Sequence, residues 1–193
     1  MCGSSFFQSG TGWINVDFGV DTSRPEWQNA EYLNFDITKT WPLVHSYANC
    51  IFASHIFEHI EYGKQRFVYE ECFRVLKHGS PIRIICPDPR KFFDNWILNN
   101  IEFIKECYGK ENVDLYGYES NRSMAFSDMF FPDHYDHAII SSISMSKMFL
   151  MRAGFSKIKE MNYGNTDFKE LFGEGEKMID NRPVMSWYLE AIK

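Results

Sequence analysis

The chain has 193 residues, enough for one domain with a full hydrophobic core and too few for two domains of ordinary size. Apolar residues make up 45% and charged residues 24%, and the formal net charge of −6 argues against broad contact with nucleic-acid phosphates. No run approaches the roughly 18 apolar residues of a membrane span, and no basic-then-apolar leader precedes a cleavage site, so we expect no membrane association.

The cysteines indicate a cellular compartment. They are five in number, scattered and without a Cys-x-x-Cys pair: Cys2, Cys50, Cys72, Cys86 and Cys107. This usage predicts a reduced, cytoplasmic protein with neither a disulfide framework nor structural zinc. We interpret Cys86 as a small apolar residue of a buried strand, not as a nucleophile.

The first stretch, "MCGSSFFQSGTGWINVDF", predicts a turn followed by a strand. Residues 13–17 have the strand pattern and end on an acid, Asp17. Cys2, Gly3 and Ser4 have the composition of a tight turn that follows a buried strand, but only Met1 precedes them. We therefore expect the buried strand that would normally precede such a turn to be missing from this sequence.

Three further strands are predicted in the first half of the chain. Segment 30–37 alternates in polarity, 48–54 is a short apolar run bounded by polar residues, and 81–88 is stopped by prolines. Residues 62–80 have apolar positions at helical spacing, with Gly79 placed as a left-handed cap. Strands separated by connectors and helices predict an α/β fold with a mostly parallel, twisted sheet and flanking helices.

The alternation of predicted strands and helices is interrupted near residue 90. Residues 90–110 suit one helix, and 111–137 have the character of a long, aromatic-rich loop, so we interpret about 90–137 as a lid inserted into a single domain, 1–193. A helix follows, from an N-cap at Ser144 to a stop at Gly154. The chain is then predicted to form a strand over 157–163, a helix over 167–173 and a strand over 183–193.

Polar residues stand where the predicted strands end. They are Asp17, Asp36, Ser54 with His55, and Asp88. In parallel α/β sheets, ligands bind outside the carboxyl ends of the strands. These residues therefore predict a ligand crevice.

Five segments resemble, in their order and spacing, the class I S-adenosylmethionine-dependent methyltransferases. They are "GWINVD", "IFASHIFEHI", "ECFRVLKHGSPIRIICPD", "LMRAGF" and "SWYLEAIK". The likeness is greatest to small predicted bacterial methyltransferases and covers nearly the whole chain outside 90–130. It implies a Rossmann-like fold, S-adenosylmethionine as the cofactor and methyl transfer as the activity.

The resemblance also implies which residues bind the cofactor. Cys2, Gly3 and Ser4 would form the turn that approaches its methionine end, where glycine permits close contact. Asp17 would bind the ribose diol through charge-assisted hydrogen bonds, and Asp36 would bind the adenine amino group.

Four more positions complete the implied site. Ile37 would join Asp36 against the adenine. Ser54 and His55 would form the floor beneath the amino-acid moiety and the sulfonium. Asp88 would face the substrate.

Two departures from the family pattern stand out. Residues 77–80 are Lys-His-Gly-Ser where the family has Pro and Gly, a change that a surface turn tolerates. The family's first strand lies between its second and fourth, and its absence would leave two inner edges unpaired, at about 1–3 kcal/mol for each buried amide. Three explanations are open: the chain continues upstream of Met1, a second copy in a homodimer supplies or covers the edge, or the flanking strands pair directly.

Methyl transfer from a sulfonium needs alignment, desolvation and at most one base, because the leaving group is already activated. We predict His55, Asp88 and His134 as the catalytic residues, from candidates that also include His59 and His137. Glu58 and His59 either take part or fix the following helix by local hydrogen bonds.

The segment "DHYDH" invites a metal interpretation, because Asp133 and Asp136 alternate with His134 and His137. No regular structure and no third, distant ligand accompany them. We therefore predict a solvated loop and no metal site.

The acceptor has no recognisable motif. The aromatic segment 124–137 suits an apolar or sugar-like small molecule, and a glycan-like acceptor is an inference by analogy. The leading hypothesis is O- or N-methylation of such a molecule. The rival is a non-catalytic relative that binds a partner through its open sheet edge or its lid, and a third hypothesis is an enzyme that uses the same cofactor for another reaction.

Overall fold

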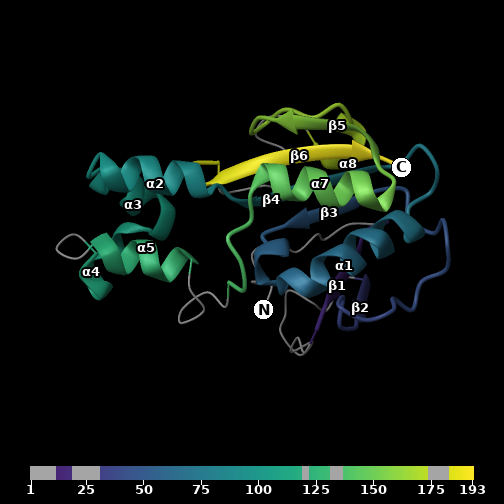
Figure 1. Ribbon diagram of the computed structural model, residues 1–193, viewed down its shortest axis with the longest axis horizontal. Coiled ribbons are helices and arrows are strands. Elements are labelled where there is room, and N and C mark those ends of the chain that lie inside the picture. Colours follow the sequence, from purple (N-terminus) through teal and green to yellow (C-terminus); the bar gives the residue numbers. More distant parts are fainter. Residues whose placement is uncertain (1–11, 19–30, 119–121, 131–136, 174–182) are drawn as a thin grey trace.

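The computed structural model describes residues 12–18, 31–118, 122–130, 137–173 and 183–193. The strands of this part form two sheets (Figure 1), one of two strands and one of four in the order β3-β4-β6-β5. In the smaller sheet β1 (Ile14–Asp17) runs parallel to β2 (Glu31–Asn34). The larger sheet consists of β3 (Ile51–Ser54), β4 (Pro81–Pro87), β5 (Ser156–Met161) and β6 (Ser186–Ile192).

The larger sheet is only partly parallel, which corrects the expectation of a mostly parallel sheet. β3 and β4 are parallel, with Ile51 opposite Ile82. β6 runs antiparallel to both of its neighbours, β4 and β5. Antiparallel neighbours such as β5 and β6 do not require a crossover connection.

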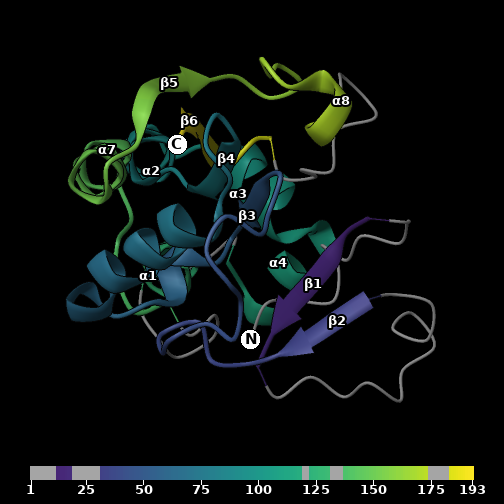
Figure 2. The same ribbon diagram turned by 90° about the vertical axis from the view of Figure 1, so that its right-hand side faces the viewer.

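Two helices cover one face of the larger sheet. They are α1 (Tyr62–Val75) and α7 (Ile143–Ala153), which lie side by side in Figures 1 and 2. The short helix α8 (Lys169–Phe172) lies on the opposite side, where Phe172 packs near Phe52 of β3. Both faces are therefore shielded over the central strands, which accounts for the burial of β4 and β6, whereas β5 is exposed or half-buried.

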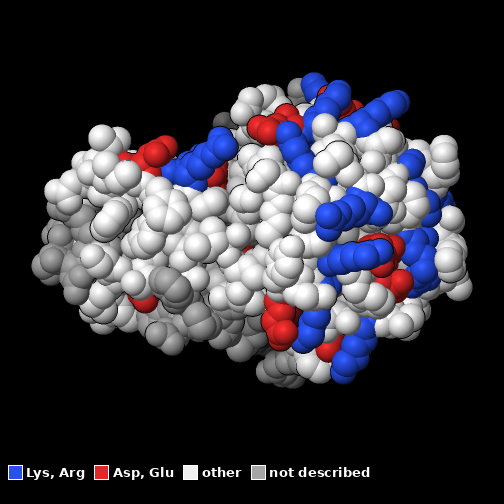
Figure 3. Space-filling view, viewed as in Figure 1, with Lys and Arg blue, Asp and Glu red and all other residues white. Residues whose placement is uncertain are grey.

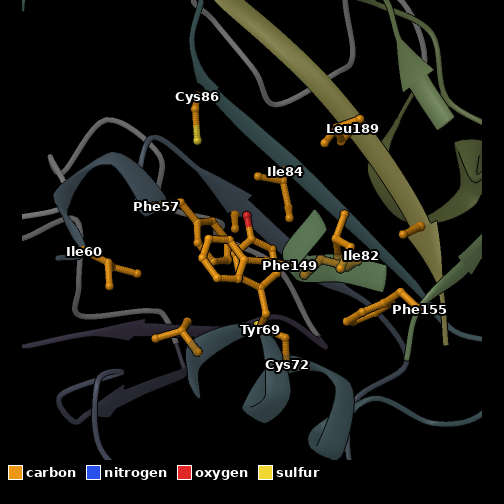
Figure 4. Close-up of a cluster of buried hydrophobic side chains, with 14 of the residues drawn as sticks. Phe57, Ile60, Tyr69, Cys72, Ile82, Ile84, Cys86, Phe149, Phe155 and Leu189 are labelled. Atoms are coloured by element: carbon orange, nitrogen blue, oxygen red, sulfur yellow. The ribbon is translucent and has the colours of Figure 1, made fainter. Parts of the chain in front are cut away.

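The main core lies between the larger sheet and its two covering helices (Figure 4). Its centre is a stack of three rings, in which the centroid of Tyr69 lies 4.4 Å from that of Phe57 and 5.5 Å from that of Phe149. Ile84 and Leu189 of the central strands are fully buried against it. The stack fixes the segment after β3, to which Phe57 belongs.

Two helix ends differ from those expected. The N-cap of α7 is Ser142, whose hydroxyl accepts a hydrogen bond from the Met145 amide at 3.3 Å, and not Ser144. Helix α1 ends at Val75, because Leu76 is extended, fully buried and bridged to Ala48. Gly79, with φ of +79°, therefore lies in the turn before β4 and not at the helix cap.

Residues 89–118 and 122–130 form a helical cluster at one end of the molecule (Figure 1). The predicted single helix over 90–110 is divided, and most of the described residues of the predicted loop that follows, 111–137, are helical. The helices are α2 (Pro89–Ile97), α3 (Ile101–Tyr108), α4 (Lys110–Tyr116) and α5 (Arg122–Phe130). They bury a second apolar cluster that includes Phe92, Phe103 and Tyr118, and this packing stabilises helices whose local sequence is a weak signal.

Charged side chains are unevenly distributed over the surface. On one face, Lys and Arg gather over the end that contains α1, α7 and β5, whereas the helical cluster shows few charges (Figure 3). None of the helices in the described ranges has both the length and the apolar character that crossing a bilayer requires.

Candidate functional site

A cavity of about 730 Å³ lies between the two sheets. Residues of β1 line one side, residues of β3 line the other, and α1 contributes Val68, Cys72 and Val75. Among the described strands, β1 is paired only with β2, and β3 only with β4. The explanation in which β1 and β3 pair directly is therefore wrong, and the cavity falls within the size range of ligand pockets, about 300–1,000 Å³.

Asp17, the last residue of β1, lines this cavity and is half-buried. Its Oδ1 accepts a hydrogen bond from the Phe18 amide at 2.7 Å, and its carbonyl accepts one from the Phe35 amide at 3.1 Å. Burial raises the pKa of the Asp17 carboxyl, against the opposing effect of the Phe18 amide. The carboxylate is therefore held in place at the cavity wall.

Asp36 and Ile37 follow β2 and line the same cavity. The Oδ1 atom of Asp36 accepts hydrogen bonds from the amide of Thr38 at 2.9 Å and from its hydroxyl at 2.7 Å, and these bonds lower the pKa of the Asp36 carboxyl. The Ile37 carbonyl accepts a hydrogen bond from the indole of Trp41 at 2.8 Å. The structure thus brings Asp17 and Asp36 to one hollow, as the strand-end rule predicts.

Ser54 and His55 follow β3 but face different surroundings. Ser54 lines the cavity, and its buried hydroxyl oxygen has no hydrogen-bond partner among the described residues. His55 is 5% exposed and is not among the lining residues. Its ring has Nε2 at 3.0 Å from Ser186 Oγ and Nδ1 at 3.1 Å from Glu58 Oε1, which places His55 behind the cavity wall.

The other predicted residues divide into described and undescribed ones. Asp88 is the N-cap of α2, where its Oδ1 accepts a hydrogen bond from the Arg90 amide at 3.0 Å, and it does not line the cavity. Cys86 is fully buried, as predicted, and burial raises the pKa of its thiol. The remaining predicted residues, Cys2, Gly3, Ser4 and His134, lie outside the described residues.

Sequence reasoning missed the aromatic wall of the cavity. Phe35 and Trp41 line it with their ring centroids 5.8 Å apart, and Thr38 lies between them in the chain. The available signal was position, because all three follow β2 within a few residues of Asp36. A planar, apolar ligand group would find contact there.

Glu58 and two histidines form a separate polar group beside the cavity. The Glu58 carboxylate accepts no hydrogen bond from the described residues, so it does not fix the following helix. The side-chain amide of Gln65 instead donates to the carbonyls of Phe57 at 2.6 Å and Ile60 at 3.0 Å. His59 lines the cavity. His137 is buried, and so it is not part of a solvated loop as expected.

No known protein family matches the chain, and no curated protein sequence is significantly similar to it. Solved structures are similar in fold. One is an S-adenosylmethionine-dependent methyltransferase from Archaeoglobus fulgidus, with a TM-score of 0.55 and 14% identity over 93% of this chain and 75% of that one. Another is an S-adenosylmethionine-dependent methyltransferase from Thermotoga maritima, with a TM-score of 0.50 and 16% identity over 86% of this chain and 65% of that one.

A third similar structure is the carbon methyltransferase CurJ, with a TM-score of 0.53 and 12% identity over 93% of this chain. The chain spans 40% of the length of CurJ and 65% of the length of the Thermotoga structure, less than two thirds in both cases. These likenesses show that the chain has the fold of the S-adenosylmethionine-dependent methyltransferases.

Proposed function

We propose that the chain binds S-adenosylmethionine in the cavity between β1 and β3 and directs its methyl group to the oxygen or nitrogen of a small-molecule or glycan-like acceptor. The observation that carries this proposal is that Asp17, at the end of β1, and Asp36, after β2, line one cavity together with Ile37 and Ser54. The fold shared with methyltransferases supports it.

The lining residues fit the chemistry of an adenosine. The Asp17 carboxylate suits a ribose diol, because a charged acceptor forms stronger hydrogen bonds than a neutral one. The aromatic wall of Phe35 and Trp41 suits the adenine ring. The buried Ser54 hydroxyl would gain a partner from a polar group of the ligand, and buried polar atoms normally have one.

In this proposal the cofactor supplies an activated methyl group, and the protein supplies alignment and exclusion of water. His59, which lines the cavity, is the described histidine best placed to accept an acceptor proton. His55 would act from behind the wall through Glu58, and Asp88 and His134 remain proposed residues of the acceptor side.

Calorimetric titration with S-adenosylmethionine and S-adenosylhomocysteine tests the proposal. We expect saturable binding, and Asp17→Ala should weaken it about 10- to 100-fold, which corresponds to the loss of about 1.5–3 kcal/mol for a hydrogen bond to a charged group. Asp94→Ala, on the exposed face of α2, is the matched control and should leave binding unchanged. An absence of heat at high micromolar cofactor would contradict the proposal.

One observation favours a second candidate, a binding module that accepts a strand. The facing edges of β1 and β3 each have a paired neighbour on one side only among the described strands. A strand from a second copy of the chain would pair with both edges and produce a homodimer. Sedimentation velocity over a range of concentrations would detect that dimer, and a monomer at every concentration would contradict it.

A further inference from the structure

Three histidines surround one buried carboxylate at the end of β3. Glu58 is 1% exposed, and neither of its carboxylate oxygens accepts a hydrogen bond of good geometry from the described residues. His55 Nδ1 lies 3.1 Å from Oε1, at ion-pair distance but without hydrogen-bond alignment. A buried carboxylate in this state requires compensation by a positive charge or by further donors.

Two distant parts of the chain are held together to make this group. The amides of Ala138 and Ile139 donate hydrogen bonds to the Glu58 carbonyl at 2.8 and 3.2 Å. They bring His137 against His59, with ring centroids 4.8 Å apart and nearly perpendicular planes. The arrangement is therefore built by backbone contacts and does not depend on a chance meeting of side chains.

The backbone conformation of His55 also helps to build the arrangement around Glu58. His55 has φ of +53°, a left-handed conformation that non-glycine residues adopt at a cost of about 1–3 kcal/mol. Its amide donates a hydrogen bond to the Ile85 carbonyl at 2.8 Å, and the Ser186 hydroxyl lies at its Nε2. These contacts hold the ring toward Glu58.

The donor atoms of Glu58, His59 and His137 lie within 4.8 Å of one another. A tetrahedral zinc ion holds nitrogen and oxygen ligands at about 2.0–2.2 Å, which places neighbouring ligand atoms about 3.4 Å apart. Small side-chain rotations would close the difference. The ligand atoms are thus near, although not at, the spacing of one coordination sphere.

The ring of His137 has the outer contact that metal-binding histidines commonly show. Its Nδ1 is hydrogen-bonded to the Met129 carbonyl, which fixes the tautomer with the proton on Nδ1. The lone pair is then on Nε2, the nitrogen that would bind a metal ion. His55 has the corresponding position beside Glu58 and would orient that carboxylate.

We propose that Glu58, His59 and His137 bind a divalent transition-metal ion, with zinc as the representative ion, and that His55 positions Glu58. Two imidazoles and one carboxylate suit zinc, iron(II) or cobalt(II), whereas magnesium and calcium prefer oxygen ligands alone. Three protein ligands leave an open coordination position, as in catalytic sites. Because His59 also lines the large cavity, the ion would lie beside it.

Titration of the full, chelator-treated and reduced chain with zinc chloride, in the absence of cofactor, tests this proposal. We expect one zinc ion per chain and little heat from magnesium chloride. Outer partners of metal ligands contribute about 10- to 100-fold to affinity, so removal of a ligand in His59→Ala or His137→Ala should weaken binding by at least about 100-fold. His55→Gln should cost about 10-fold, as expected of an outer partner.

Matched controls exclude surface histidines and failed folding. The double variant His45→Ala/His78→Ala removes two exposed histidines and should bind zinc as the unchanged chain does. Cobalt(II) added to the unchanged chain should give visible absorption bands, and Glu58→Gln, whose fold is checked by circular dichroism, should alter them. Unchanged affinity in the His59 and His137 variants, or an absence of cobalt bands, would overturn the proposal.

None of these measurements requires S-adenosylmethionine. A chain that binds zinc through these residues but gives no heat with the cofactor would support the metal site and contradict the proposed methyl transfer. The reverse result would do the opposite.

Discussion

The central strands of the larger sheet differ in burial from the strands of the smaller sheet. Every residue of β4 is buried, and so is all but the last residue of β6. In β1 and β2, by contrast, every residue is half-buried or exposed. The residues proposed to bind the cofactor, Asp17 and Asp36, belong to the less buried sheet and its following loop, so a ligand in the cavity would supply contacts that the smaller sheet lacks.

The largest expected effect concerns the buried ion pair of the larger sheet. The Nη1 atom of Arg83, on β4, lies 2.6 Å from Oε1 of Glu190, on β6. The same Nη1 atom donates a hydrogen bond to the Asn165 carbonyl at 3.1 Å. Glu190→Gln leaves the guanidinium without its counter-charge, and breaking a buried pair costs about 3–5 kcal/mol. Urea unfolding should show a loss of this size in the free energy of unfolding.

The matched control for Glu190→Gln is Glu160→Gln on the neighbouring strand β5. Glu160 pairs with Lys147, but their side chains are 57% and 34% exposed. Such a pair contributes about 0–1 kcal/mol. An equal loss from both substitutions would mean that burial does not distinguish the two pairs.

The next prediction compares the cost in unfolding free energy of truncating an apolar side chain in each sheet. Ile84→Ala on β4 removes a fully buried side chain and should cost about 2–5 kcal/mol. Val16→Ala on β1 removes two methyl groups from a half-buried position and should cost about 1 kcal/mol. If urea unfolding gave equal losses, the smaller sheet would be as integral to the core as the larger one.

Ligand binding should reduce the contrast between the sheets. S-adenosylhomocysteine at about 100 times its dissociation constant should stabilise the chain by about 2.7 kcal/mol. If the cavity is its site, amide exchange measured by mass spectrometry should slow more in β1 than in β4. Because Asp17→Ala is expected to bind about 10- to 100-fold more weakly, it should reduce the stabilisation to about 0.4–1.4 kcal/mol at the same ligand concentration and diminish the difference between the strands. Equal slowing in both strands would place the ligand elsewhere.

The strands and the residues at their ends were largely predictable because their signals are local. Alternation and short apolar runs identified β1 to β4, and the carboxyl-end rule then brought Asp17, Asp36 and Ser54 to one cavity. The rule could not tell which way a side chain turns after the strand. His55 follows Ser54 directly, yet it turns to Glu58 and Ser186 behind the wall.

Features that depend on distant contacts were not predictable. Helix α5 is stabilised by the packing of Phe130 against Phe92, which no local pattern shows. The proximity of Glu58 and His59 to His137 was not predicted, because it depends on contacts between distant parts of the chain, among them the backbone hydrogen bonds between residues 58 and 138–139. The sequence presents these residues as two unrelated short motifs.

The smallest expected effect concerns two carboxyl groups whose pKa values are shifted in opposite directions. One belongs to the smaller sheet and the other to a helix that covers the larger sheet. Burial raises the pKa of Asp17, in the smaller sheet, above its ordinary value of 3.8. The hydrogen bond from Arg74, with the amide of Trp41, lowers the pKa of Glu71, on the helix α1, below its ordinary value of 4.5 despite partial burial.

Linkage between protonation and folding gives these shifts opposite consequences. The folded chain binds the Asp17 proton more tightly than the unfolded chain, so this contribution to stability is present below pH 3.8 and is lost as the pH rises through the raised pKa. Glu71 contributes stability above pH 4.5, and it is lost as the pH falls through the lowered pKa. Acidification should therefore increase the free energy of unfolding of the unchanged chain relative to that of Asp17→Asn. It should decrease the free energy of unfolding of the unchanged chain relative to that of Glu71→Gln. Urea unfolding between about pH 3 and pH 7 measures both, and a common sign would show that Asp17 is not desolvated at the cavity wall.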